Sequence, residues 1–200
     1  MASRTEIANL ALGHLGQSRI VDLSQNSPAA EALRDCWAPA REATLRAHHW
    51  NFATARTTLA PLAEAPAFEW SYQYPLPADY CRLVSVNEVL AGTRDCPFVV
   101  EGGRLLSHEA NARVVYVRNV EATELWDADF VLAFSFQLAE LAAPRLSNDG
   151  GQAARIALRK QEAGLTAMLS DATETRPLVR RASEGSEYLA ARAGWHREIG

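Results

Sequence analysis

The spacing of apolar residues changes twice along this 200-residue chain, and that change limits the folds that it can adopt. Apolar residues recur every three or four positions in the first quarter of the chain and again after Val120, as in amphipathic helices. Between these regions, aromatic and β-branched residues alternate with polar ones, which is typical of strands. We therefore predict an α+β fold that is mainly α, a helical bundle with a small inserted antiparallel β module. The predicted parts are one domain of residues 1–172, made of a helical body (1–60 and 120–172) and a β module (about 68–118), and an extended C-terminal tail of 173–200.

The two N-terminal helices have recognisable boundaries. Ser3-Arg4-Thr5-Glu6 has the form of a capping box, in which serine and glutamate side chains bond backbone N–H groups at the helix start. Gly16 is the expected stop of this first helix, because glycine readily adopts the left-handed conformation that ends many helices. Ser27-Pro28 begins the second helix with a cap residue and a proline in the first turn. We expect Pro39 to bend this helix without breaking it. The apolar stripe of the second helix is Leu33, Cys36, Ala40, Ala43 and Ala47.

Two further helices follow the β module. Asp127 is the expected cap of a core helix over about 128–143, which Pro144 and the turn Ser147-Asn148-Asp149-Gly150-Gly151 should end. Its apolar face consists of Phe130, Val131, Phe134, Leu138 and Leu141, extended by Leu132 and Phe136. The last helix covers about 151–171. Its apolar and small residues alternate spacings of four and three, which predicts a helix-packing seam. The seam residues are Ala154, Leu158, Gln161, Leu165, Met168 and Ala172.

Five segments of the middle region are predicted strands, two of them the short runs Phe98–Glu101 and Arg104–Leu106. The alternating aromatics of Phe68–Tyr74 indicate a half-buried strand that ends at Pro75. Leu83–Leu90 and Ala112–Arg118 are rich in β-branched residues. Gly102-Gly103 separates two short apolar runs, which is the signal of a two-residue hairpin turn.

Composition excludes several classes of protein. The net charge is −4, whereas a free DNA-binding protein needs a basic excess for its phosphate contacts. Three cysteines without a C-x-x-C pair argue against a disulfide framework or a zinc site. The first residues lack the apolar stretch of a signal peptide, and no apolar run reaches the length of about 18 residues needed to cross a membrane. We expect synthesis in a reducing cytoplasm.

The neighbouring histidines His48 and His49 are the most obvious candidates for catalysis or metal binding. Adjacent side chains on a helix point about 100° apart, so the pair is poorly placed to bind one ion. We interpret them, with Trp50 and Phe52, as closing the helix end against the core. The aromatic run Trp70–Tyr74 could stack single-stranded bases, but it lacks interleaved arginines and is better explained as part of the β module.

An acidic cluster precedes the helix that begins near 128. Carboxylates at this place either hold a divalent cation in a nuclease or favour the positive end of the helix dipole, and we favour the helix start. The cluster consists of Glu121, Glu124, Asp127 and Asp129. No nucleophile motif of a hydrolase is present, so we predict no catalytic residue, cofactor or metal and regard the chain as a non-enzyme.

The C-terminal tail loses helical periodicity from Thr173. A polar segment with a few large apolar residues is hard to stabilise by itself but is suited to docking on another chain. The alternative is a tail that packs on its own chain or stays unstructured. The predicted docking residues are Pro177, Leu178, Val179, Arg180, Arg181, Tyr188, Leu189 and Trp195.

Several segments, in order, resemble one family of virus proteins. They are Ile7–Gly16; residues 32–56, where a long helix ends at His48-His49-Trp50-Asn51-Phe52 and an extended segment follows; Tyr74–Val86 with its L-P-x-D sequence; Val100–Leu106; Val114–Val117; and Phe130–Pro144. Together they resemble the tail tubular protein A family, the head-to-tail adaptors (connectors) of short-tailed bacteriophages. The resemblance covers roughly residues 4–145.

The resemblance implies a structural virion protein of the neck and tail. Such a protein forms a homo-oligomeric ring, typically twelve-fold, that joins the portal protein to the tail nozzle. Genomic DNA would pass through the ring without sequence-specific binding, and no membrane is involved. On this view the C-terminal tail docks on the portal or on a neighbouring subunit. The alternatives are another joining protein, such as a head-completion or tail-terminator protein, and a metal-dependent nuclease built on the acidic cluster.

Overall fold

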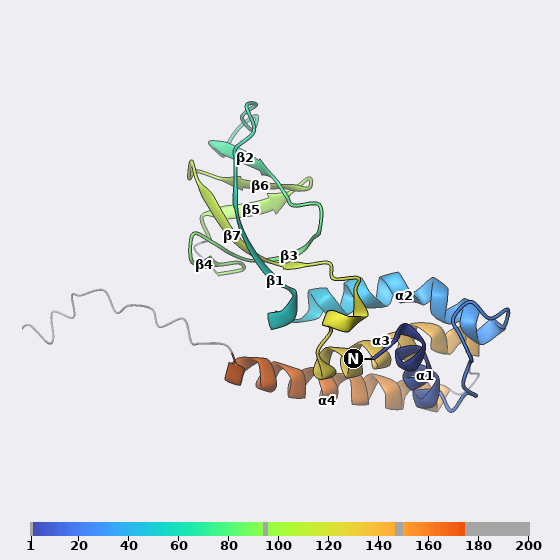
Figure 1. Cartoon of the computed structure of the whole chain (residues 1–200). Coiled ribbons are helices and arrows are strands. Elements are labelled where there is room, and N and C mark those ends of the chain that lie inside the picture. Colours follow the sequence, from blue (N-terminus) through green and yellow to red (C-terminus); the bar gives the residue numbers. More distant parts are fainter. Residues whose placement is uncertain (1, 94–95, 147–149, 175–200) are drawn as a thin grey trace, which may run out of the picture.

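The computed structural model describes residues 2–93, 96–146 and 150–174, and within them it has the predicted α+β, mainly α, architecture (Figure 1). The helices are α1 (Arg4–His14), α2 (Pro28–Ala47), α3 (Ala128–Leu146) and α4 (Gly150–Glu174), with short 3-10 turns at Asn51–Ala53 and Thr123–Leu125. The strands are β1 (Thr54–Leu59), β2 (Tyr72–Pro75), β3 (Tyr80–Val86), β4 (Val89–Leu90), β5 (Phe98–Glu101), β6 (Arg104–Ser107) and β7 (Ala112–Arg118).

The helices form a layered body with α3 at its centre. α3 contacts α1, α2 and α4, whereas α4 packs mainly on α3 and forms an outer layer (Figure 1). Asp127 caps α3 as predicted, because its Oδ1 accepts a hydrogen bond from the Phe130 N–H at 2.6 Å. Phe130 and Phe134 are fully buried and meet Trp50 and Trp126 through ring contacts. The core of the body therefore lies around the N-terminal half of α3.

Both ends of α1 follow the predicted chemistry. The Glu6 N–H donates to Ser3 Oγ at 3.2 Å and the Ser3 N–H donates to Glu6 Oε2 at 2.6 Å, which completes the capping box. At the other end Gly16 has a φ of 63°, and the Gln17 N–H donates to the Leu12 carbonyl at 2.9 Å. This is the hydrogen bond of a Schellman motif, so the predicted stop is confirmed.

Helix α2 begins at its predicted cap and continues through Pro39. Ser27 Oγ accepts a hydrogen bond from the Ala30 N–H at 3.3 Å, and the helix extends to Ala47. The predicted apolar stripe is only partly right, because Ala43 and Ala47 are exposed. The buried face is instead completed by the larger side chains of Trp37 and Leu45, which remove more apolar surface from water than alanine does.

Pro144 does not end α3, which corrects the predicted end at about 143, while residues 147–149 of the predicted turn lie outside the described residues. The helix continues to Leu146, two residues beyond the proline. Arg145 explains the continuation, since its Nη1 lies 2.6 Å from Asp35 Oδ2 and its Nη2 lies 3.9 Å from Glu31 Oε1 on α2. These contacts hold the last turn of α3 against α2 although proline removes one backbone hydrogen bond.

The β module consists of two antiparallel sheets. One has the strand order β1-β7-β3-β4 and the other β2-β6-β5, and a second core lies within the module. The Gly102-Gly103 turn joins β5 to β6 with φ angles of 54° and 73°, as predicted for a two-residue hairpin. The prediction places residues up to 60 in the helical body, which is wrong for Thr54–Leu59, because this segment pairs with β7 and belongs to the sheet. The module therefore begins 14 residues before the predicted start at about 68.

The predicted boundaries of two strands are wrong, because residues with positive φ angles interrupt the extended backbone. Glu69 has a φ of 69°, which interrupts the predicted strand Phe68–Tyr74, so β2 begins only at Tyr72 and extends through Pro75. Pro75 is tolerated because β2 is an edge strand of its sheet. The predicted strand Leu83–Leu90 is a hairpin of β3 and β4, because Asn87 and Glu88 between them have φ angles of 47° and 72°.

Candidate interaction surface

Helix α4 packs on the body through a narrow face of small and branched side chains. Ile156, Ala163 and Ala167 are 3%, 9% and 2% exposed, and they are spaced seven and four residues apart. Beside this face, Lys160 Nζ lies 2.6 Å from Glu140 Oε2 of α3. This single face therefore accounts for the attachment of α4 to α3.

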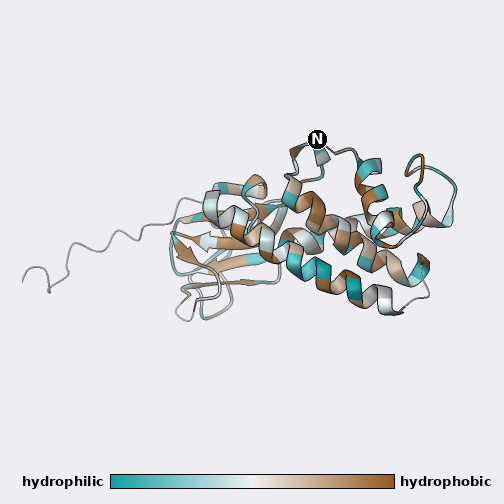
Figure 2. Cartoon of the chain, turned by 90° about the horizontal axis from the view of Figure 1, so that it is seen from below, coloured by the Kyte–Doolittle hydropathy of each residue, from teal (hydrophilic) through white to brown (hydrophobic). Residues whose placement is uncertain are grey.

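The opposite face of α4 is also apolar. Leu165 follows Ile156 by nine residues, which is two and a half helical turns, so the two side chains point in opposite directions. Four large hydrophobic side chains on this outward face are exposed, namely Leu158 at 63%, Leu165 at 56%, Met168 at 45% and Leu169 at 70%. Figure 2 views the molecule from below and shows hydrophobic residues interrupting the hydrophilic ones along α4. We call these four residues the α4 outer face.

The α4 outer face coincides with the predicted helix-packing seam. Leu158, Leu165 and Met168 belong to both, yet α4 contacts α3 through its other side. The sequence pattern thus identified a packing stripe without identifying its partner. Scattered exposed leucines are ordinary on a protein surface, but four large apolar side chains along one helix face are typical of an interaction site.

The helix that carries the α4 outer face ends at Glu174, within the predicted docking tail of residues 173–200. The tail residues Pro177, Leu178, Val179, Arg180, Arg181, Tyr188, Leu189 and Trp195 lie outside the described residues. The prediction that they dock on a partner therefore stays a prediction.

The histidine and tryptophan cluster at the end of α2 supports the core. Trp50 is 2% exposed, and its Nε1–H donates to the Thr44 carbonyl at 2.9 Å. The His48 ring meets Trp50 edge-on at 5.0 Å, and His49 Nε2 lies 2.9 Å from Thr54 Oγ1. Phe52 packs edge-on against the buried core of α3. This arrangement confirms that the cluster closes the helix end.

The acidic cluster is divided among structural contacts. Glu121 Oε1 lies 2.6 Å from Arg41 Nη2, and Asp127 caps α3. Among the residues that the structure describes, no group of three or more His, Cys, Asp or Glu side chains lies close enough to hold a metal ion. The helix-start interpretation therefore explains Asp127, and an ion pair explains Glu121.

The aromatic run around β2 does not present its rings on one open face. Tyr74 is fully buried, and its hydroxyl donates to the Glu109 carbonyl. Trp70 stacks on His108 with ring centroids 4.9 Å apart. These two rings are thus used in packing, as the interpretation of this run as part of the β module requires.

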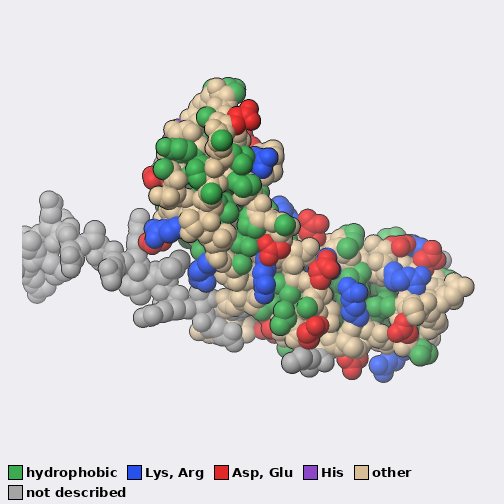
Figure 3. Space-filling model, turned by 45° about the horizontal axis from the view of Figure 1, so that its top comes forward, with side chains coloured by type: hydrophobic (Ala, Val, Ile, Leu, Met, Phe, Trp, Pro, Cys, Tyr) green, Lys and Arg blue, Asp and Glu red, His purple; other side chains and the backbone are tan. Residues whose placement is uncertain are grey.

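The surface carries charges of both signs. Figure 3 shows Lys and Arg side chains beside Asp and Glu over the helices, and hydrophobic side chains gathered over the β module. In the described parts of the chain, no helix has the combination of length and apolar character needed to cross a membrane. The sequence matches no family profile, and no curated protein matches it.

Proposed function

We propose that this chain is a structural virion protein, a head-to-tail adaptor whose copies form a ring between the portal and the tail of a short-tailed bacteriophage. The observation that carries the proposal is the α4 outer face. A helix that is apolar on two opposite sides is suited to packing on two partners, and α4 has α3 on one side only. Complete burial of a leucine or methionine side chain contributes about 1.5–3 kcal/mol, so covering this face would stabilise an assembly substantially.

A ring follows from contact between identical copies. When the α4 outer face of one copy meets a different surface on the next, the contact is head-to-tail and closes into a ring if the rotation closes. The ordered resemblance of residues 4–145 to the adaptor family supplies the portal and tail nozzle as partners and a typical copy number of twelve. The helical body would then build the ring wall, with the predicted tail docking on the portal or a neighbour.

The charge of the chain supports a channel role. With a net charge of −4 and mixed charges over its helices, the chain does not attract DNA strongly (Figure 3). Genomic DNA would pass such a wall without being held by it.

Mass photometry of the purified chain, alone and mixed with the portal ring from the same genome, tests the proposal. Stepwise added mass that saturates at one or a few copies per portal subunit supports an adaptor and gives the stoichiometry. Absence of a complex at micromolar concentrations contradicts it. A plasmid-cleavage assay with magnesium or manganese on the same sample separates the adaptor from the nuclease alternative.

A further inference from the structure

A groove of about 550 Å³ lies between α1, the loop after it and α2, away from the α4 outer face. Leu23, Trp37 and Ala38 give it an apolar lining, and the arginines Arg4 and Arg34 contribute positive charge. Nothing in the proposed ring requires this groove, so its chemistry is a separate question.

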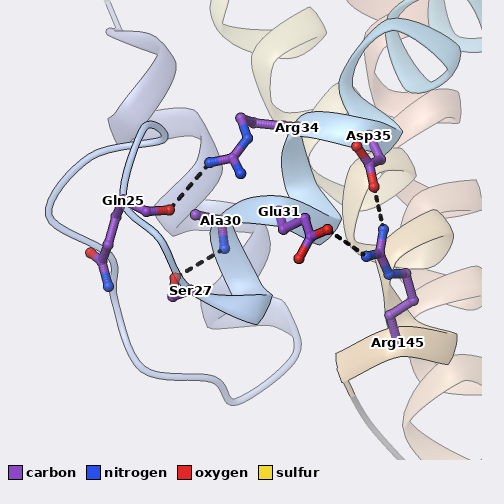
Figure 4. Close-up of polar contacts among 7 residues, drawn as sticks. All are labelled: Gln25, Ser27, Ala30, Glu31, Arg34, Asp35 and Arg145. Atoms are coloured by element: carbon purple, nitrogen blue, oxygen red, sulfur yellow. Dashed lines mark hydrogen bonds and ion pairs between the residues drawn. The ribbon is translucent and has the colours of Figure 1, made fainter.

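In the described residues, neither Arg4 nor Arg34 forms an ion pair with a carboxylate. Arg34 Nη1 donates to the backbone carbonyls of Leu23 at 2.5 Å and of Gln25 at 3.2 Å, and Figure 4 shows it reaching from α2 to the loop. The guanidinium carbon of Arg4 lies 5.5 Å from the Trp37 ring centroid. Arg41, which lines the same groove, differs because it pairs with Glu121.

Trp37 lines the same groove, and its indole nitrogen is buried without a partner among the described residues. It is 6% exposed, and its Nε1–H is the one buried side-chain polar group without a hydrogen-bond partner in the described part of the chain. The other two buried indoles do have acceptors, since Trp50 donates to the Thr44 carbonyl and Trp126 to the Val120 carbonyl. The Nε1 atom exposes less than 1 Å² to solvent, so a ligand in the groove does not reach it, and the Trp37 ring contributes apolar surface to the lining instead.

We propose that this groove binds an acidic side chain of a partner protein, an aspartate or glutamate flanked by apolar residues. The carboxylate would pair with Arg4 and Arg34, since guanidinium groups bind carboxylates through paired hydrogen bonds. The apolar neighbours would cover Leu23 and Ala38. This site does not depend on the proposed ring, because it is complete within one copy.

The charges around the groove favour a single carboxylate over a polyanion. Asp22 and Glu121 also line it, so a run of phosphates that reached both arginines would meet these carboxylates. A peptide with one acidic side chain avoids that repulsion and uses the apolar lining as well. Protein is therefore the partner class that these contacts fit.

A titration of the ¹⁵N-labelled full chain with short peptides tests the site directly. The probes are acetyl-Leu-Glu-Phe-amide and its glutamine counterpart, acetyl-Leu-Gln-Phe-amide, and the readout is the indole N–H signal of Trp37, assigned with Trp37→Phe. We expect the acidic peptide to move this signal, because the Trp37 ring lines the groove, and the glutamine peptide to bind at least about tenfold more weakly, which is about 1.4 kcal/mol. Arg4→Gln and Arg34→Gln should each weaken binding by a similar factor.

Two controls keep the result interpretable. Arg113→Gln removes an exposed arginine of the β module, 3.8 Å from Glu88, and should leave peptide binding unchanged. Arg34 also holds the loop after α1, so Arg4→Gln is the deciding variant. The proposal is overturned if the Trp37 signal does not move at millimolar peptide, if the glutamine peptide binds equally well, or if inorganic phosphate displaces the peptide at equal concentration.

Discussion

Arg41 of α2 binds the connector between the β module and α3 through Glu121, with Nη2 2.6 Å from Oε1. Its Nε also donates to Asn119 Oδ1 at 3.0 Å. The Arg41 side chain is 8% exposed and the Glu121 side chain 68%, so the contact runs from the interior to the surface. One guanidinium thus fixes the point at which the chain leaves β7 and returns to the helical body.

Loss of Arg41 should therefore weaken the whole domain. Arg41→Met removes both hydrogen bonds while keeping much of the apolar stem, and we expect a loss of about 1–3 kcal/mol in the free energy of unfolding. Glu121→Gln keeps an oxygen acceptor on an exposed side chain and should cost less, about 0.2–1 kcal/mol. Urea unfolding of both variants measures the difference, and equal effects would contradict the role assigned to Arg41.

Matched substitutions on the two faces of α4 should separate assembly from folding. Leu165 is 56% exposed and Ala163 is 9% exposed, and both lie in the middle of the helix. Leu165→Glu should change the free energy of unfolding by no more than about 0.5 kcal/mol while weakening self-association on the portal. Ala163→Glu places a charge against α3 and should destabilise the fold by several kcal/mol. Urea unfolding and mass photometry on each variant give the two readouts, and an assembly unaffected by Leu165→Glu would argue against the outer face.

Stability should fall as the pH drops below neutrality because of His14. The ring stacks on Phe136 at 3.9 Å and its Nε2 lies 2.9 Å from Ser135 Oγ. Burial, and then the positive charge of Arg159, lower the pKa of His14 below its ordinary value of 6.5. The unfolded chain therefore binds the proton first, and the stability present above pH 6.5 is lost as the pH falls through the unfolded and then the folded pKa. Urea unfolding at pH 7.5 and 5.5 should show a smaller difference for His14→Gln than for the parent; an equal difference would exclude His14 as its source.

The buried cysteine, Cys81, should react slowly in the native protein. Burial raises the pKa of the Cys81 thiol and of the Cys36 thiol, and Cys81 is 3% exposed. Because the thiolate is the reactive form, Ellman's reagent at pH 8 should modify Cys81 only as fast as the protein opens. The same reagent in urea gives the control rate for all three thiols. Cys81 lies where β3 packs on α2, since Arg46 Nη1 donates to the Cys81 carbonyl at 2.5 Å, and reaction of Cys81 at the control rate without urea would contradict this packing.

Local chemistry explains which parts of the fold were predictable from sequence. The Ser3–Glu6 capping box, the Ser27 cap, the Asp127 cap and the Gly102-Gly103 turn each depend on residues within four positions of one another, and all four are present. Such contacts form between residues close in sequence and do not depend on the rest of the chain, so they can be predicted from the sequence alone.

Errors arose where distant residues decide the local conformation. The Asn87 turn is held by contacts 24 and 26 residues away, since its side chain donates to the Asn111 carbonyl and accepts from the Arg113 N–H. Arg145 likewise continues α3 past Pro144 through its contacts with α2 (Figure 4). Neither partner is visible in the local sequence pattern.

The candidate surface was predicted in part. The spacing of Leu158, Leu165 and Met168 indicates a packing seam, but periodicity cannot say whether the partner belongs to the same chain. In the structure, the side chains of Leu158, Leu165 and Met168 are exposed to solvent instead of packing on α3. The Arg4 and Arg34 groove was missed entirely, because its residues come from α1 and from α2 and become neighbours only through the loop between them.

Photo-crosslinking from Leu165 tests the central claim, that the α4 outer face joins copies of this chain, most directly. Leu165 is replaced by p-benzoylphenylalanine, the variant is mixed with portal rings, and the crosslinked products are mapped by mass spectrometry. In a control variant, the same group replaces Leu125, which lies elsewhere on the body and is 53% exposed. The account predicts covalent links from position 165 to a second copy of the chain, in greater yield than from position 125. Links only to the portal, or none although the complex forms, would contradict it.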